Sequence, residues 1–266
     1  MSVLVVIPAR FASTRYPGKP LVALKGADGT AKTLIERSWL AAMSASGVDR
    51  VVVATDDARI KAAAEGFGAE VVMTATTCRN GTERCAEALD VLAAQYDIVV
   101  NLQGDAPLTP AWFVEELVAQ LRAAPEFDVA TPVLRTHGAA LNGFLEDRRA
   151  GRVGGTTVVF AADKRALYFS KEVIPYRGKT YTDDDETPVF HHVGVYAYRP
   201  AALQRYIAAA PSALEDLEGL EQLRFLDIGV PVLCVEVEAR GRAFWELNNP
   251  EDVPRIETML FQMGLN

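Results

Sequence analysis

The sequence predicts an α/β protein with a doubly wound, mostly parallel, Rossmann-like sheet. Short β-branched apolar runs, such as those at 50–55 and 98–102, alternate with helical stretches in the first half of the chain. This alternation is typical of βαβ units, and the apolar runs suit strands that are buried on both faces. At 266 residues, 50% of them hydrophobic, the chain can bury a sizeable core. We expect one domain over 1–266, in which about 128–200 contributes a smaller β-rich subdomain.

The first half of the chain supplies the predicted sheet. Pro8 is expected to end the first strand, because proline cannot extend a hydrogen-bonded ladder, and Gly47 is expected to stop the first helix. The expected elements, in order, are a strand at 3–7, a helix at 34–45, a strand at 50–55, a helix at 58–66, a strand at 70–73, a helix from 81 to about 94 and a strand at 98–102.

The second half has a looser pattern. Residues 136–155 hold several glycines and little periodicity, so we expect an irregular excursion there. Leucines at intervals of three from Leu214 to Leu226 predict one helix that packs on the sheet. The other expected elements are a strand at 128–135, a hairpin of 156–160 with 166–170, a polar loop at 177–187, strands at 191–198 and 230–237, and a closing helix at 250–263.

Composition excludes several classes of function. A net charge of -8 argues against a general nucleic-acid binder, which would need a large basic face. The 3 cysteines lack zinc-site spacing, so we expect reduced thiols and a cytoplasmic protein. Because the chain opens on a predicted core strand, we expect no signal peptide, and no apolar run is long enough to cross a membrane.

A basic loop follows the first strand. Arg10, Arg15 and Lys19 are interleaved with small residues such as Ala9 and Gly18, which let backbone amides approach a ligand closely. Amide donors combined with guanidinium forks and an ammonium group are what a polyphosphate requires. The alternative is a solvated surface loop with incidental charges.

Arg84 lies in the first turn of the helix that begins at Gly81. A cation is unfavourable there, because the amino end of a helix carries a partial positive charge. An anionic or carbonyl-bearing ligand nearby would explain it. The alternative is a surface salt bridge to Glu83 or Glu87.

Acidic and histidine residues suggest two further features. Asp105 follows a predicted central strand and a glycine, where a carboxylate can hold a divalent cation bound to phosphates; the alternative is an N-cap for a helix that begins near Pro110. The acidic run at 183–186 is expected to be a solvated tip, and we assign it no metal. His191 and His192 are adjacent on a strand, so only one of them can face a given pocket.

Eight stretches together resemble one family, the CMP-Kdo synthetases, that is, the 3-deoxy-manno-octulosonate cytidylyltransferases. They follow the family's order over nearly the whole chain. The matching stretches are IPARFASTRYPGKPL at 7–21, VATDD at 53–57, NGTER at 80–84, VNLQGDAPL at 100–108, ALYFSK at 166–171, HHVGVYAYR at 191–199, LEGLEQLRFL at 217–226 and NPEDV at 249–253.

The resemblance implies a nucleotidyltransferase that joins CTP to 3-deoxy-manno-octulosonate (Kdo). The products would be CMP-Kdo and pyrophosphate, with Mg²⁺ as cofactor, for lipopolysaccharide or capsule synthesis. It also implies a homodimer to which the β-rich segment contributes contacts. We expect no nucleic-acid or membrane partner.

The resemblance also implies a role for each matching position. Arg10, Arg15 and Lys19 would hold the triphosphate and, with Asp105 on the metal, are the candidate catalytic residues. Ala9 and Gly81 would line the nucleotide, and Arg84 and Gln103 would read the cytosine edge. The residues that would contact the sugar acid are Lys171, His192, Tyr196, Glu221 and Gln222.

Some positions depart from the family pattern on the sugar and metal side. Asn248 stands where an aspartate is usual, and its amide oxygen would ligate Mg²⁺ without bringing a charge. Glu246 would compensate only if the loop is rearranged. Ala106 replaces an acidic residue, Thr157 a basic one, and Lys171 an arginine, which removes a bidentate carboxylate contact.

These departures leave other functions open. The closest is the same reaction on another sugar acid, such as an amino-Kdo or a sialic-type nonulosonate. Another is a catalytically weak nucleotide-binding paralogue. A uridylyl- or guanylyltransferase acting on a sugar phosphate would share the fold type.

Overall fold

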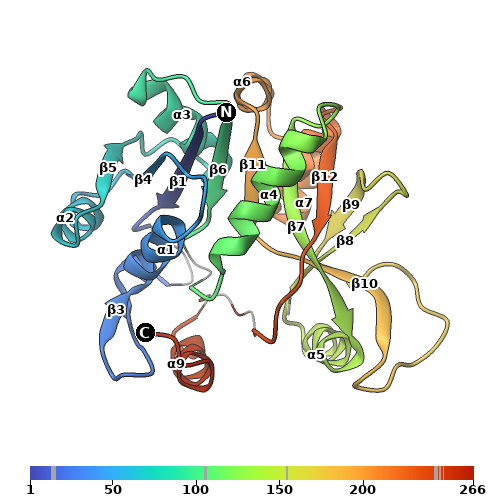
Figure 1. Cartoon of the computed structure of the whole chain (residues 1–266). Coiled ribbons are helices and arrows are strands. Elements are labelled where there is room, and N and C mark those ends of the chain that lie inside the picture. The colour runs from blue at the N-terminus through green and yellow to red at the C-terminus, as the bar shows by residue number, and fades with distance from the viewer. Residues whose placement is uncertain (13–15, 105–106, 154, 243–244, 246, 248) are drawn as a thin grey trace. The chain divides into compact units, whose positions relative to one another are not determined.

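The computed structural model of the chain describes residues 1–12, 16–104, 107–153, 155–242, 245, 247 and 249–266. It divides into two compact units (Figure 1). Unit 1 comprises Met1–Val118 and Ala239–Asn266, and unit 2 comprises Ala119–Glu238. The helix α4 (Ala111–Ala123) includes the boundary between them. The segment expected to be β-rich, about 128–200, falls inside unit 2.

Unit 1 contains the parallel sheet that the sequence predicts. Its strands lie in the order β5, β4, β1, β6, and every neighbouring pair is parallel (Figure 1). The α/β class and the mostly parallel sheet are therefore confirmed. The elements are β1 (Val3–Ala9), α1 (Leu34–Met43), β4 (Arg50–Thr55), α2 (Ala58–Gly66), β5 (Glu70–Met73), α3 (Gly81–Leu92) and β6 (Ile98–Leu102).

The order of these strands contains a reversal beside β1. From β1 the chain adds β4 and then β5 on one side, after which it returns through α3 to place β6 on the other side of β1. Open α/β sheets bind ligands at the carboxyl ends of the strands next to such a reversal. In unit 1 those ends belong to β1 and β6.

The expectation that Pro8 ends the first strand is wrong. The strand β1 continues to Ala9, and Pro8 pairs in register with Ala54 of β4. The register with β6 covers only Val3 to Val6, so at Pro8 the strand has a described neighbour on one side only. A missing N–H group is tolerated at such an edge position.

Smaller elements complete unit 1. A 3₁₀ turn (Lys19–Leu21) leads into a hairpin of β2 (Ala23–Lys25) and β3 (Ala31–Thr33), which the sequence did not predict. The predicted closing helix is confirmed as α9 (Asp252–Gln262). It packs its apolar side into a cluster of buried residues: Leu24, Leu34, Leu108, Leu247, Ile256 and Leu260.

Unit 2 is built around the long strand β7 (Val129–His137). Along one side β7 pairs with β11 (Val195–Tyr198) and β10 (Glu186–His192), both antiparallel, and it also pairs with β12 (Val232–Glu236), which is parallel. The predicted hairpin is confirmed as β8 (Thr156–Phe160) and β9 (Ala166–Ser170), and β8 also pairs with β10. A bridge between Arg165 and Leu233 connects the hairpin turn back to β12.

Two expectations for unit 2 are wrong. Part of the segment expected to be irregular is the helix α5 (Gly138–Arg149), which buries few side chains, among them Leu141. The helix expected from Leu214 to Leu226 is two short helices, α7 (Ala213–Glu218) and α8 (Leu223–Asp227). Gly219, with φ +61°, caps α7 in the left-handed conformation that favours glycine. Leu217 is consequently 83% exposed instead of packing on the sheet.

The other helix of unit 2 is α6 (Pro200–Ala208), which follows β11 directly. In the described part of the chain, no helix is both long and apolar enough to span a lipid bilayer.

Candidate active site

The basic loop leaves β1 at its carboxyl end, beside the strand reversal. Ala9 is buried as the last residue of β1. Arg10 is exposed, and its Nη1 donates to the carbonyl oxygen of Arg79 at a distance of 3.5 Å. The backbone N–H of Gly18 donates to the carbonyl of Phe11 at 2.9 Å, which closes the base of the loop. Lys19 follows as the first residue of the 3₁₀ turn. Arg15 lies outside the described residues.

Gly18 fits this loop for two reasons. Its φ of +73° lies in the left-handed region, and a Cβ at this position would be 3.0 Å from the ring of Phe11. The guanidinium of Arg59 covers the same ring, with its Cζ 3.3 Å from the ring centroid. The Phe11 ring therefore packs against both Gly18 and the Arg59 guanidinium.

The amino end of α3 packs against the ends of β1 and β6. Asn80 caps the helix, accepting from the N–H of Glu83 at 2.9 Å. A Cβ on Gly81 would lie 3.0 Å from Asn101 Nδ2 and 3.3 Å from the Pro8 ring, so only glycine fits without displacing them. This contact brings the amino end of the helix, which carries a partial positive charge, to the edge of the sheet from which the basic loop leaves.

Arg84 is buried rather than on the surface. It is 3% exposed, hydrogen bonds to the Thr74 hydroxyl and forms a 3.3 Å ion pair with Asp56, which directly follows β4. The surface salt bridge that we weighed as the alternative therefore does not describe its main environment. The carboxylates of Glu83 and Glu87 accept the backbone N–H groups of Arg79 and Ala75, each at 2.7 Å. Whether Arg84 contacts a nucleotide stays a prediction.

Gln103 and Gly104 follow β6 at the same edge. Gln103 is half-buried, and a Cβ on Gly104 would contact the carbonyl of Pro8 at 3.4 Å, so this segment lies beside the end of β1. Asp105, Ala106, Glu246 and Asn248 lie outside the described residues. Within the described ranges, no cluster of three or more acidic, histidine or cysteine side chains is arranged to hold a metal ion.

In unit 2 the structure brings three of the predicted sugar-contacting residues together. His192 is buried, with its ring edge-on to Phe169 and 5.5 Å from the ring of Tyr196. The Tyr196 hydroxyl donates to Gln222 Oε1 at 3.0 Å. His191 instead packs on Phe144 of α5, so the two histidines face opposite sides of β10, as predicted.

Lys171 lies against the turn that carries Glu221 and Gln222. A Cβ on Gly219 would be 2.8 Å from the Lys171 Nζ, which places the ammonium group over this glycine. The preceding residue, Glu218, accepts hydrogen bonds from the backbone N–H of Lys171 at 2.9 Å and the Ser170 hydroxyl at 2.7 Å. The end of β9 is therefore tied to the turn between α7 and α8.

A buried ion pair that sequence reasoning missed fixes the same turn. Arg224 and Glu215, 2% and 6% exposed, form a bidentate pair with both N–O distances at 2.6 Å. Tyr206 stacks beneath Arg224 and donates its hydroxyl to the backbone carbonyl of Glu221 at 3.1 Å. The available sequence signal was Ser212-x-x-Glu215, a capping box, which the leucine spacing obscured.

Burial of His192 predicts that the protein loses stability in acid. Desolvation, with a smaller contribution from His191, lowers the pKa of His192 from 6.5 to about 3. Below pH 6.5 the unfolded chain binds a proton that the folded chain does not. The free energy of unfolding should therefore fall by about 1.4 kcal/mol per pH unit from this residue.

Urea unfolding at pH 7 and pH 5 measures this slope. Replacing His192 with glutamine should remove this residue's share of the slope and leave the share of His191, because burial lowers the pKa of His191 to about 4. Replacing the exposed His137 with glutamine should leave the slope unchanged. An unaltered slope in the His192 variant would contradict the assignment of a buried neutral imidazole.

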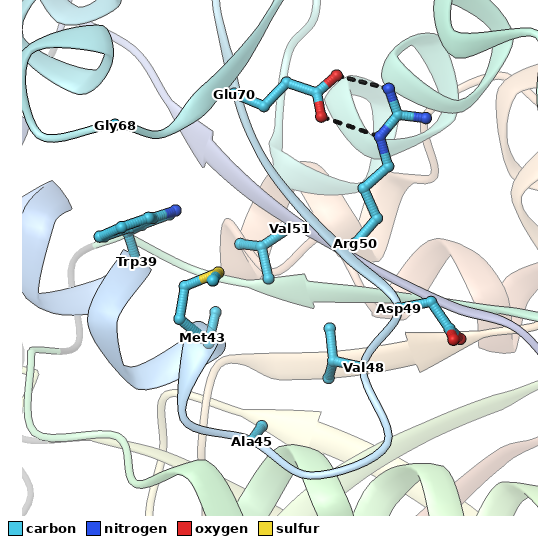
Figure 2. Close-up of a pocket in the computed structure, with 10 residues that line it drawn as sticks. Trp39, Met43, Ala45, Val48, Asp49, Arg50, Val51, Gly68 and Glu70 are labelled. Atoms are coloured by element: carbon cyan, nitrogen blue, oxygen red, sulfur yellow. Dashed lines mark hydrogen bonds and ion pairs between the residues drawn. The ribbon is translucent and has the colours of Figure 1, made fainter.

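A pocket of about 290 Å³ lies elsewhere in unit 1 (Figure 2). Trp39 and Met43 of α1 form part of its wall, and the bidentate pair of Arg50 with Glu70 lies at its edge. Arg50 begins β4, so this pocket is at the amino end of the strand, and none of the predicted site residues lines it. The candidate site is therefore not this pocket, because ligands of parallel sheets bind at the carboxyl ends.

Known proteins resemble this chain over most of its length. A family model described as cytidylyltransferase matches residues 4–236. The 3-deoxy-manno-octulosonate cytidylyltransferase of Maricaulis maris is 45% identical over 264 residues, covering 99% of both chains. The mitochondrial enzyme of that name from Arabidopsis thaliana is 37% identical over 267 residues, covering 98% of this chain and 84% of the other. A solved structure of CMP:2-keto-3-deoxy-manno-octonic acid synthetase complexed with CTP superposes with a TM-score of 0.82 at 32% identity, over 99% of this chain and 100% of that one.

Proposed function

The chain belongs to the cytidylyltransferase family, among relatives named 3-deoxy-manno-octulosonate cytidylyltransferase, and from this premise we propose that it joins CTP to Kdo. The products are CMP-Kdo and pyrophosphate. One structural observation supports the proposal above the others. The basic loop after β1, the amino end of α3 and the segment after β6 meet at the strand reversal of unit 1, where a nucleotide triphosphate would bind.

The reaction needs positioning and charge stabilisation more than a nucleophilic side chain. The anomeric hydroxyl of Kdo attacks the α-phosphate of CTP, the bond between the α- and β-phosphates breaks, and pyrophosphate leaves. Arg10, Arg15 and Lys19 supply cations for the triphosphate, and Ala9 and Gly81 leave room for it to approach the backbone. Arg84 and Gln103 are proposed to recognise the cytosine.

We propose Mg²⁺ as the cofactor. Asp105 directly follows Gly104 in the sequence, and Gly104 lies beside the Pro8 carbonyl after the carboxyl end of β6. Asp105 would hold the ion, with Asn248 and Glu246 as candidate further ligands, and carboxylate and amide oxygens are donors that Mg²⁺ accepts. When bound, the ion would polarise the phosphate and lower the pKa of the attacking hydroxyl.

The sugar acid is proposed to bind unit 2 residues. The ammonium group of Lys171 is a point charge suited to a carboxylate, while His192, Tyr196, Glu221 and Gln222 offer polar groups to hydroxyls. The proposed cytoplasmic location rests on the cysteine pattern of the sequence. The homodimer and the supply of CMP-Kdo for lipopolysaccharide or capsule synthesis rest on the resemblance alone.

A panel of acceptors tests the proposal. The protein is incubated with CTP, Mg²⁺ and, separately, Kdo, an amino-Kdo or a sialic-type nonulosonate, while pyrophosphate release is followed and the product is weighed by mass spectrometry. We expect turnover with Kdo and a CMP-Kdo product. If only another acid is turned over, that acid and not Kdo is the acceptor. Lys171 and Asn248, which depart from the family pattern, would account for the different acceptor.

Two binding measurements, read beside the pyrophosphate assay, separate the other classes of function. CTP binding in calorimetry without pyrophosphate from any acid would indicate a nucleotide-binding paralogue. Protection against unfolding by UTP or GTP, but not by CTP, would indicate a different nucleotidyltransferase.

A further inference from the structure

Thr131 of β7 is the buried polar partner of His192. Its Oγ1 lies 2.9 Å from His192 Nε2, and the residue is fully buried. The same oxygen lies 2.8 Å from the backbone carbonyl oxygen of Val195 and 3.4 Å from that of Val193. All of these atoms belong to unit 2.

The positions of the protons follow from this geometry. A carbonyl oxygen carries no proton, so two oxygens only 2.8 Å apart attract each other only if the hydroxyl proton lies between them. Thr131 has a single hydroxyl proton, and it is therefore directed at the Val195 carbonyl. The Nε2 of His192 must then supply the proton for its own 2.9 Å contact with Thr131.

The other ring nitrogen is fixed as a consequence. Burial lowers the pKa of His192 to about 3, so near neutral pH the imidazole carries one proton. With that proton on Nε2, Nδ1 presents a lone pair and can only accept a hydrogen bond. A carboxylate has no proton to offer it, whereas a sugar hydroxyl does.

Gln222 complements this acceptor. Tyr196, whose ring packs on His192, donates to Gln222 Oε1, which orients the amide. Gln222 is 1% exposed, and its Nε2 has no hydrogen-bond partner among the described residues. A buried donor without a partner is costly, so a ligand oxygen is the natural acceptor for it. One acceptor and one donor together match hydroxyl groups.

We propose that Thr131 is a positioning residue that fixes His192 as the Nε2–H tautomer, so that His192 Nδ1 accepts a hydrogen bond from a hydroxyl of the sugar acid. This rests on the proposed function, because it takes His192 as a contact of the acceptor substrate. Thr131 itself touches neither substrate.

Two substitutions at Thr131 and one matched control test the proposal. Thr131→Val keeps the shape and removes the hydroxyl, and Thr131→Ser restores it. The control is Thr136→Val on the same strand. Thr136 is also buried, and its hydroxyl lies 2.6 Å from that of Thr187. Each valine variant therefore removes a hydroxyl that contacts a side chain and a backbone carbonyl: His192 and Val195 for Thr131, Thr187 and Val189 for Thr136.

The first readout is the tautomer. The chain has only 3 histidines, so a long-range ¹H–¹⁵N spectrum of the imidazole nitrogens can be assigned with His192→Gln. We expect the Nε2–H form in the wild type, in Thr131→Ser and in Thr136→Val, and a mixed or Nδ1–H form in Thr131→Val. An Nδ1–H or imidazolium form in the wild type overturns the proposal without the need for any variant.

The second readout is the Michaelis constant for each substrate. Thr131→Val should raise KM for Kdo about 10-fold, as expected for one lost hydrogen bond. KM for CTP should be unchanged, and the urea midpoint should match that of Thr136→Val. An unchanged KM for Kdo in Thr131→Val would overturn the positioning role. If the wild type has the expected tautomer but makes no CMP-Kdo, the proposed function fails while the tautomer assignment stands.

Discussion

Replacing Asp105 with asparagine should lower kcat at saturating Mg²⁺ by about 100- to 1,000-fold, that is, about 2.7–4 kcal/mol of transition-state stabilisation. Asp105 is the one carboxylate that both the strand pattern and the family resemblance assign to the metal. An asparagine there keeps the size but removes the charge that would hold a divalent cation. The fold should be unaffected, because the change is close to isosteric.

Pyrophosphate release measured against Mg²⁺ concentration checks this expectation. Asp184→Asn is the matched control, since Asp184 lies in the exposed acidic run to which we assign no metal, and it should behave like the wild type. Calorimetry with CTP in the absence of Mg²⁺ should give similar affinities for all three proteins. Near-normal turnover of the Asp105 variant would refute the metal assignment.

Replacing Arg224 with methionine should destabilise the protein by about 3–5 kcal/mol, because it leaves the Glu215 carboxylate buried without its ion-pair partner. Adding Glu215→Leu should recover much of the loss, since two apolar side chains can replace a buried ion pair without leaving a charge behind. Tyr206 packs on Arg224 and donates to the backbone carbonyl of Glu221, so the single variant should also disturb the turn with the predicted sugar contacts and weaken Kdo binding.

Urea unfolding followed by circular dichroism measures the effect. All 3 tryptophans (Trp39, Trp112 and Trp245) belong to unit 1, so tryptophan fluorescence would not follow unit 2 directly. Arg165→Met is the control. Arg165 pairs with Asp163 on the surface, at 2.9 Å, where solvent screens the charges, so its loss should cost far less than the loss of Arg224. Equal losses from the buried and exposed arginines would contradict the prediction.

Sequence patterns were most informative in unit 1. Each buried strand there is a short run of β-branched residues between polar segments, and each helix follows closely along the chain. Such signals are local, so the order of elements, and with it the basic loop after β1 and the Gln103–Asp105 segment after β6, could be predicted. The end of β1 was predicted too early, at Pro8. A strand tolerates proline where no neighbouring strand needs its N–H group, and whether β6 reaches Pro8 is known only from the folded sheet.

Unit 2 was less predictable because its signals are not local. The helix α5 has weak periodicity and is held by contacts with β7 and β10. Leucine spacing predicted one helix at 214–226, but Gly219 and the pairing of Glu215 with Arg224 favour two. The leucine spacing is a strong local signal, but the glycine cap and the buried ion pair, which form only in the folded chain, outweigh it.

By itself, the sequence determined the α/β class and the family, because short motifs and local periodicity carry both. The assignment of residues to nucleotide, metal and sugar acid stays a prediction from the same motifs. Only the tertiary structure decided the environments of those residues. It buried Arg84 beside Asp56, directed Thr131 at His192, and left Gln222 Nε2 without a described partner. Burial and hydrogen-bond partners depend on residues far apart in the chain, and they set the protonation and the orientation of each functional group.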